Sequence, residues 1–246
     1  MKAMVFAAGL GTRLKPITDS MPKALVPICG KPLLYHVICK LRDAGYDEIV
    51  VNVHHFAGQI KEYLEANYFG VRISISDESD LLRETGGGIM HARRLLEGSG
   101  EPFLVHNVDI VSNLDLSWFR GQWRPGALAT LLVSERRTQR YLLFDDDMRL
   151  VGWTNVATGE VRSPYPGLQP ERFRKLAFAG IHNISPAVFG VFEEYGCPER
   201  FPIMDFYLQA CAGHPVYGAV APGLTLVDVG KKETLAEAER ICETLL

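Results

Sequence analysis

The chain has 246 residues, of which 47% are hydrophobic and 22% are charged, and its formal net charge is −3. This composition is typical of a folded globular protein and excludes a disordered one. The small negative charge gives no general attraction to nucleic acid, and no apolar run approaches the roughly 18 residues that span a bilayer. We therefore expect a cytoplasmic protein whose partners are small molecules, with neither nucleic acid nor a membrane among them.

The first half of the chain alternates strand-like and helix-like segments. Strands are expected at 1–8, 48–53, 71–76 and 103–107, and helices at 32–44, at 59–65 and directly after the glycines at 86–88. Segments that alternate in this way are typical of βαβ units, in which the strands run parallel and helices cover both faces of the sheet.

From about residue 127 the pattern changes to strands that are joined by turns. Strands are expected at 127–133, 141–144, 150–154, 176–183 and 225–229, helices at 203–211 and 233–246, and an exposed, proline-rich loop at 163–171. We predict the α/β class, with a three-layer, Rossmann-like, mainly parallel mixed sheet. A chain of this length is expected to form a single domain over 1–246.

A glycine-containing segment follows the first expected strand directly. In it, Gly9 and Gly11 allow backbone amides to approach a ligand that side chains would exclude. Arg13 can fork onto phosphate oxygens, and Lys23 adds a compact positive charge. A dinucleotide-binding fingerprint would need a third glycine where Leu14 stands, and no GxxxxGK[S/T] motif occurs. The segment indicates phosphate binding, although a tight turn beside surface cations has the same local pattern.

Two aspartates stand near the ends of expected strands. Asp109 follows the strand at 103–107, and Asp228 lies in the strand at 225–229. Open α/β sheets bind their ligands at the carboxyl ends of strands. Magnesium commonly takes one or two carboxylates together with substrate phosphates and water, so the pair could share Mg²⁺. Capping of turns is the alternative that the residues alone leave open.

The full string from Gly9 to Pro32, GLGTRLKPITDSMPKALVPICGKP, resembles the signature GxGTRLxPxTxxxPKxLxPxxGKP of the sugar-phosphate nucleotidyltransferases, or NDP-sugar pyrophosphorylases. Every fixed position of the signature is present. The resemblance continues through ETGGG at 84–88, HNVD at 106–109, FAGI at 178–181 and VDVG at 227–230. Within the family, the chain is most similar to the uridylyltransferases that act on N-acetylmuramate 1-phosphate.

The resemblance implies a reaction in which a sugar 1-phosphate attacks the α-phosphorus of an NTP, with Mg²⁺ as cofactor and pyrophosphate as leaving group. It also implies a nucleotide-binding half at about 1–125 and a sugar-binding half at about 126–246. UTP is favoured, but GTP or CTP with mannose, heptose or another phosphate substrate remains an alternative. A non-catalytic, sugar-nucleotide-sensing regulatory subunit is another. A monomer or a small homo-oligomer is expected.

The resemblance assigns residues to four roles. The catalytic residues are Arg13, Lys23 and Asp109, and the metal ligands are Asp109 and Asp228. The nucleotide-binding residues are Ala8, Gly9, Gly11, Thr12, Glu84, Gly86 and Gly87, and the sugar-binding residues are Asn107 and Gly180. Arg140 is added to the sugar-binding residues as a hypothesis from its positive charge. The segment 84–88 is interpreted as a loop that approaches the nucleotide and opens the next helix. Val108 stands where the family has a small residue, and its branched side chain would narrow the pocket beside the metal.

The remaining polar residues are given simpler roles. A phosphate monoester is mostly dianionic at neutral pH, so no catalytic base is required and the histidines, His54, His55, His106 and His182, are expected to be structural. The five cysteines contain no CxxC pair and are expected to be reduced thiols. The arginines at 136, 137 and 140 could pair with an acidic group of the sugar or form a solvated basic face.

Overall fold

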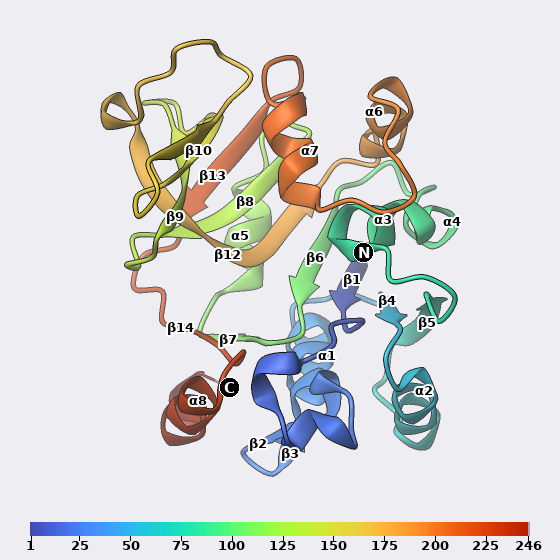
Figure 1. Ribbon diagram of the computed structural model, residues 1–246. Coiled ribbons are helices and arrows are strands. Elements are labelled where there is room, and N and C mark those ends of the chain that lie inside the picture. Colours follow the sequence, from blue (N-terminus) through green and yellow to red (C-terminus); the bar gives the residue numbers. More distant parts are fainter. Residues whose placement is uncertain (246) are drawn as a thin grey trace.

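The computed structural model describes the backbone of residues 1–245 and the side chains of residues 1–241. Its main feature is a ten-stranded mixed sheet with the order β11-β10-β9-β12-β6-β1-β4-β5, to which β8 and β13 are joined through β12. Figure 1 shows this sheet running through the molecule, with helices on both of its sides. The expected fold class is confirmed.

The parallel part of the sheet is built by the first half of the chain. Its strands are β1 (Lys2–Phe6), β4 (Glu48–Val53), β5 (Arg72–Asp77) and β6 (Phe103–Asn107), paired in the order β5-β4-β1-β6. Both faces of β1 are covered, so its residues 3–5 are all buried and read as an unbroken apolar run. Because side chains alternate along a strand, Ala3 and Val5 belong to one hydrophobic core and Met4 to the other.

Helices cover the two faces of the sheet. The first core takes residues from α1 (Leu33–Asp43), α2 (Ala57–Ala66), α5 (Leu116–Gly121) and α8 (Lys232–Leu245), and the second takes residues from α3 (Glu84–His91), α4 (Arg93–Leu96), α6 (Val188–Glu194) and α7 (Ile203–Ala210). Within α1, the buried side chains recur at positions 33, 34, 37, 38 and 41, the spacing of one helix face. The molecule therefore has the three layers that the sequence predicted.

The second half of the chain extends the same sheet. Its strands are β8 (Ala129–Ser134), β9 (Arg140–Phe144), β10 (Leu150–Asn155), β11 (Glu160–Arg162), β12 (Arg174–Ile184) and β13 (Val216–Val220). Strand β12 runs antiparallel to β6 and pairs Ile181 with His106. Its pairing with β8 shifts register between Phe178 and His182, around Gly180, which has a φ of 75°. The resulting irregularity lies beside the end of β6.

Two small sheets flank the ends of the parallel strands. Strand β14 (Leu226–Asp228) pairs antiparallel with β7 (Ile110–Ser112), so Asp228 lies opposite Ile110. Asp228 therefore ends a strand, as expected, and that strand belongs to a small sheet beside the main one, because β14 pairs with the segment that follows β6. The second small sheet, β2 (Pro27–Ile28) and β3 (Lys31–Pro32), follows three short 3-10 helices at 12–14, 17–19 and 23–25.

Several expectations are corrected in detail. Helix α3 begins at Glu84 and contains the glycines at 86–88, which were expected to precede it in a loop. The expected loop at 163–171 includes the start of a 3-10 helix, Pro170–Arg172. Residue 246, the last of the expected final helix, lies outside the described residues. Cys39, Cys197 and Cys211 are free, whereas Cys29 is disulfide-bonded and is not the reduced thiol that was expected. In the described part of the chain, no helix combines the length and the apolarity that a membrane crossing requires.

Candidate active site

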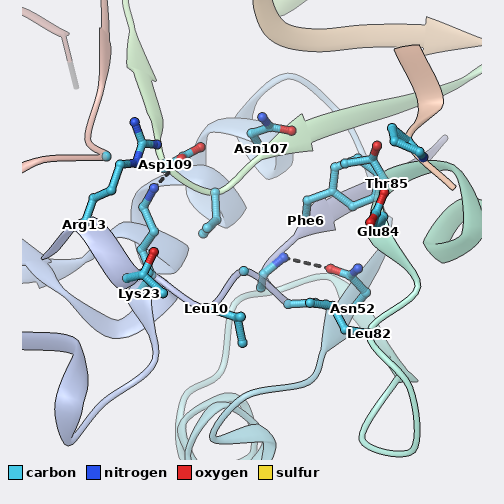
Figure 2. A pocket seen from close by; sticks show the side chains of 18 residues that line it. Phe6, Leu10, Arg13, Lys23, Asn52, Leu82, Glu84, Thr85, Asn107 and Asp109 are labelled. Carbon is cyan, nitrogen blue, oxygen red and sulfur yellow. Dashed lines mark hydrogen bonds and ion pairs between the residues drawn. The ribbon is translucent and has the colours of Figure 1, made fainter. Parts of the chain in front are cut away.

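A cavity of about 550 Å³ lies at the carboxyl ends of β1, β4 and β6. Figure 2 shows its two ends: Arg13, Lys23 and Asp109 gather at one, and Glu84 and Thr85 lie at the other. Between them run the glycine-containing segment after β1 and the side chain of Asn107. This edge is where a doubly wound sheet places its ligands.

The segment after β1 turns under the cavity with its backbone exposed to it. The amide of Ala7 donates to Oδ1 of Asn52 at 2.7 Å, which fixes the exit from the strand. Gly11 has a φ of 64°, and a Cβ there would lie 2.9 Å from Cγ2 of Thr18, so glycine is required on both counts. A Cβ on Gly9 would meet no protein atom within 4 Å, although Gly9 lines the cavity. The backbone at Gly9 is thus open to a ligand.

The cationic end brings together four residues that the sequence singled out. Lys23 is 8% exposed, and its ammonium group donates to the carboxylate of Asp109. A Cβ on Gly230 would lie 2.6 Å from Nη2 of Arg13 and 2.8 Å from Oδ1 of Asp228, so both groups pack against that glycine. The predicted cluster of two cations and two carboxylates is present in the structure. Gly230, which the sequence analysis did not single out, is what allows Arg13 and Asp228 to approach.

Asp228 has the least satisfied carboxylate of this cluster. Its Oδ1 is buried and has no hydrogen-bond partner among the described residues. Burial raises the pKa of Asp228, the negative charge of Asp109 raises it further, and the charges of Lys23 and Arg13 oppose the shift. The amide of Val229 donates to the carbonyl of Asp109 at 2.8 Å, which keeps the two aspartates together.

These features fit a divalent cation. Two adjacent carboxylates that repel each other, one with an unpartnered buried oxygen, are a donor set that suits magnesium. No group of three or more His, Cys, Asp or Glu residues capable of holding a metal exists among the described residues. A cation at Asp109 and Asp228 would therefore complete its coordination with substrate oxygens and water.

The opposite end of the cavity is formed by the start of α3 and by Pro202. Glu84 and Thr85 line it, and Glu84 has a φ of 61°, a conformation that is rare for residues other than glycine. Gly86 and Gly87 lie behind this wall and do not line the cavity. A Cβ on Gly86 would lie 2.2 Å from the Phe201 ring, and one on Gly87 would lie 2.3 Å from a backbone oxygen. These glycines let α3 pack closely on the segment 199–201.

The residues expected to bind the sugar occupy three different environments. Asn107 lines the cavity. Gly180 does not, but a Cβ there would lie 3.0 Å from Nδ2 of Asn107, so β12 approaches Asn107 closely. Arg140 is exposed at the start of β9 and does not line the cavity. Arg136 lies nearer to the two aspartates than Arg140 does. Its Nη2 donates to the carbonyl of Phe178 at 3.2 Å, and its charge opposes the rise that burial causes in the pKa of Asp228.

The cavity also has lining residues that were not expected. Asn52, Leu82 and Pro202 are among them. Asn52 could have been found, because it is the one polar residue inside the apolar run IVVNV at 49–53. Leu82 and Pro202 carry no comparable signal. Val108 is buried and lines the cavity beside Asp109, as expected from its place in the motif.

The histidines do not line the cavity, which agrees with the structural role expected for them. His106 and His182 are buried, and burial lowers their pKa values to about 4 and about 3, respectively. His182 shares a hydrogen bond of 2.9 Å with the hydroxyl of Tyr207. His54 makes one of 2.6 Å with the carbonyl of Glu78.

The fold, the glycine-containing segment and the paired cations and carboxylates define a phosphate-handling α/β enzyme. Residues 2–138 match the nucleotidyl transferase family. The chain therefore belongs to this family and is a nucleotidyltransferase, as its sequence predicted.

Two relatives carry the same name. An N-acetylmuramate alpha-1-phosphate uridylyltransferase of Caulobacter vibrioides is 33% identical, over 98% of this chain and 97% of the relative. The protein of that name from Neisseria meningitidis serogroup B is 43% identical, over 48% of this chain and 50% of the relative. A catalytic subunit beta of mannose-1-phosphate guanylyltransferase from Drosophila pseudoobscura pseudoobscura is 33% identical, over 59% of this chain and 41% of the relative.

Solved structures share the fold at lower identity. A putative glucose-1-phosphate thymidylyltransferase from Bacillus anthracis has a TM-score of 0.81 at 17% identity. The match includes all of this chain and 96% of the other. A UDP-glucose pyrophosphorylase in complex with UDP-glucose has a TM-score of 0.76 at 18% identity, with 99% of this chain and 98% of the other covered. At these identities the likeness concerns the fold.

Proposed function

We propose that this enzyme transfers a uridylyl group from UTP to a sugar 1-phosphate, releasing pyrophosphate and forming a UDP-sugar. The observation that carries the proposal is the polarity of the cavity. One end has two cations and the carboxylate of Asp109, with Asp228 beside them, which suit phosphates and a divalent cation. The other end is a wall beside Glu84 and Thr85 that leaves room for a base. A nucleoside triphosphate has the same polarity along its length.

The residues of the cationic end divide the work on the phosphates. Backbone amides at 8–12 approach the triphosphate, because Gly9 and Gly11 carry no side chain that would stand in the way. Arg13 and Lys23 bind its oxygens and neutralise the charge that develops as pyrophosphate leaves. Asp109 and Asp228 would hold Mg²⁺, which would withdraw negative charge from the phosphate oxygens.

The nucleophile needs no help from a histidine. A phosphate monoester with a second pKa of about 6 is already mostly dianionic at neutral pH, so its oxygen can attack directly. The enzyme must then align the two substrates and offset their repulsion. Asn107 orients the sugar phosphate, and Gly180 lets β12 pack closely on Asn107. Within one domain over 1–246, we assign the nucleotide to the half at about 1–125 and the sugar mainly to the half at about 126–246, with Asn107 contributed by the first half.

We favour N-acetylmuramate 1-phosphate as the sugar, which would place the reaction in cell-wall recycling in the cytoplasm. The Caulobacter relative of that name aligns with nearly the whole chain, whereas the guanylyltransferase relative aligns with 59% of it. The sugar carries a carboxylate, and Arg136 lies near the metal-binding end of the cavity without an acidic partner among the described residues. A guanylyl- or cytidylyltransferase is the alternative within the same chemistry.

We also propose that the chain is an enzyme and not a purely regulatory subunit, and that it acts as a monomer or a small homo-oligomer. A sensing subunit would have no need to keep Arg13, Lys23, Asp109 and Asp228 together, and all four meet at one end of the cavity. Nothing in the reaction calls for residues from a second chain, so a monomer or a small homo-oligomer would serve equally.

The test is a matrix of pyrophosphate-release assays with four NTPs and several sugar 1-phosphates, including the muramate, glucosamine and mannose derivatives. We expect the highest rate with UTP and N-acetylmuramate 1-phosphate, and no rate without a divalent cation. Asp109→Asn should abolish release, and the exposed Asp146→Asn should not. Release with GTP and mannose 1-phosphate alone would move the assignment to the guanylyltransferases. No release from any pair would refute the proposal.

A further inference from the structure

Two charged cross-links join the start of α3 to the segment 199–203. Arg83 Nη2 donates to the carboxylate of Glu199 at 2.9 Å, and Arg200 Nε donates to Oε1 of Glu84 at 3.1 Å. Each pair of neighbouring residues carries one positive and one negative charge, so that residue 83 pairs with residue 199 and residue 84 with residue 200. The partners are 116 positions apart in the chain, and only the second cross-link includes a residue that lines the cavity.

The backbone around these cross-links is fixed by other contacts. The amides of Gly86 and Gly87 donate to the carbonyl of Phe201 at 2.9 and 3.2 Å. The amide of Ile203 donates to Oγ1 of Thr85 at 2.8 Å. Arg83 is 4% exposed and forks onto both carboxylate oxygens of Asp80 at 2.7 Å. The position of the segment 199–203 against α3 therefore does not depend on the Arg200 side chain.

Glu84 itself is held in a strained position. Its φ of 61° costs energy in a residue with a side chain, and such conformations persist where the surroundings impose them, often at ligand sites. Arg200 occupies one oxygen of its carboxylate, and the other, Oε2, has no hydrogen-bond partner among the described residues. One free acceptor therefore remains on a side chain at the end of the cavity that is opposite to Lys23 (Figure 2).

We propose that Arg200 is a positioning residue, which orients Glu84 so that its free carboxylate oxygen accepts a hydrogen bond from the N3–H on the edge of the nucleobase. This rests on the proposed function, because it takes the base to lie at this end. Uracil presents an N3–H donor at that edge, whereas cytosine presents a bare N3 acceptor that a carboxylate repels. Arg200 therefore acts on the choice of base through Glu84 and has no contact with the reacting phosphates.

The experiment compares Arg200→Ala with Glu199→Gln, which alters the neighbouring cross-link and leaves Glu84 untouched. We expect Arg200→Ala to raise the KM for UTP and lower the UTP-over-CTP ratio of kcat/KM by roughly tenfold each, the effect of one misaligned hydrogen bond. The kcat should change little, and Arg200→Lys should restore part of the ratio. Glu199→Gln should keep the wild-type ratio. An equal loss in Glu199→Gln would overturn the proposal, since the segment and not the guanidinium would then matter.

A double-mutant cycle separates action through Glu84 from any other effect. In the Glu84→Ala background, Arg200→Ala should have no further effect on UTP binding measured by calorimetry, because its target is gone. A further tenfold loss there would overturn the proposal. Binding of UTP is measured without turnover, so this arm stands even if no sugar 1-phosphate is accepted. If the wild type is active and Arg200→Ala discriminates UTP from CTP as strongly as the wild type does, the inference about Arg200 fails while the proposed function stands.

Discussion

Lys23 donates a hydrogen bond from its ammonium group to Oδ2 of Asp109, across 86 positions of the chain and with side-chain exposures of only 10% and 19%. The positive charge of Lys23 balances the negative charge of the Asp109 carboxylate, which would otherwise lie unpaired beside Asp228. The same carboxylate is a proposed ligand of Mg²⁺. A cation held by Asp109 would compete with the ammonium group for this carboxylate, and a bound triphosphate would draw Lys23 towards its own oxygens.

Replacement of Lys23 by methionine should separate these two roles. We expect Lys23→Met to bind a divalent cation roughly tenfold more tightly without nucleotide, because Asp109 is no longer occupied. Turnover should fall at least about 100-fold, the usual loss when one charge-stabilising donor is removed. Manganese titration followed by electron paramagnetic resonance gives the first quantity, and pyrophosphate release gives the second. Lys61→Met is the control, since Lys61 pairs with Asp77 away from the cavity. Unchanged manganese affinity in Lys23→Met would contradict the competition.

The sequence predicts much of this site because its signals are local. The strands Glu48–Val53 and Phe103–Asn107 match expectation at both ends, since each is an apolar run next to residues that break it. Residues that follow the carboxyl ends of neighbouring parallel strands meet at one edge of the sheet, so the meeting of the glycine-containing segment with Asp109 could be foreseen.

The parts that could not be predicted depend on contacts between distant segments. Nothing near Gly86 in the sequence indicates that Phe201 lies against it, so the role of this glycine in packing could not be predicted. The pairing of β14 with β7 has the same origin, because a three-residue strand has too few side chains to indicate its partner. Arg140 was chosen by its neighbours in sequence, whereas in the structure it is Arg136 whose charge acts on the carboxylate of Asp228.

The close packing of α3 leads to opposite predictions for two helical glycines. Gly86→Ala should lower the free energy of unfolding by about 1–3 kcal/mol, because its Cβ would lie 2.2 Å from the Phe201 ring. Gly58→Ala, in α2, should raise it by about 0.5–1 kcal/mol, since a Cβ there meets nothing within 4 Å and alanine favours a helix. Urea denaturation followed by circular dichroism measures both. Equal stabilities of the two variants would show that α3 yields to the added methyl group.

The arginines at positions 136 and 140 should differ in their effect on the use of the sugar substrate. Arg136→Ala should lower kcat/KM for N-acetylmuramate 1-phosphate by roughly tenfold or more, because a guanidinium near Asp228 can pair with a substrate anion. Arg140→Ala should change it less than about twofold, as expected of an exposed charge at a strand end. Comparison with N-acetylglucosamine 1-phosphate, which lacks the carboxylate, identifies the group concerned. A loss that is equal for both sugars would assign Arg136 to the phosphate.

The buried His182 predicts how stability depends on pH. Its pKa in the fold is about 3 because burial disfavours the charged ring, whereas that of an unfolded chain is about 6.5. Below pH 6.5 the unfolded state therefore binds a proton that the folded state does not, and the free energy of unfolding falls as the pH falls. Between pH 7.5 and pH 5, His182 should account for a loss of about 2 kcal/mol. His182→Gln should flatten the pH profile from urea denaturation by this amount, and the exposed His91→Gln should leave it unchanged. A His182→Gln profile parallel to that of the wild type would mean that the ring takes up its proton in the folded protein.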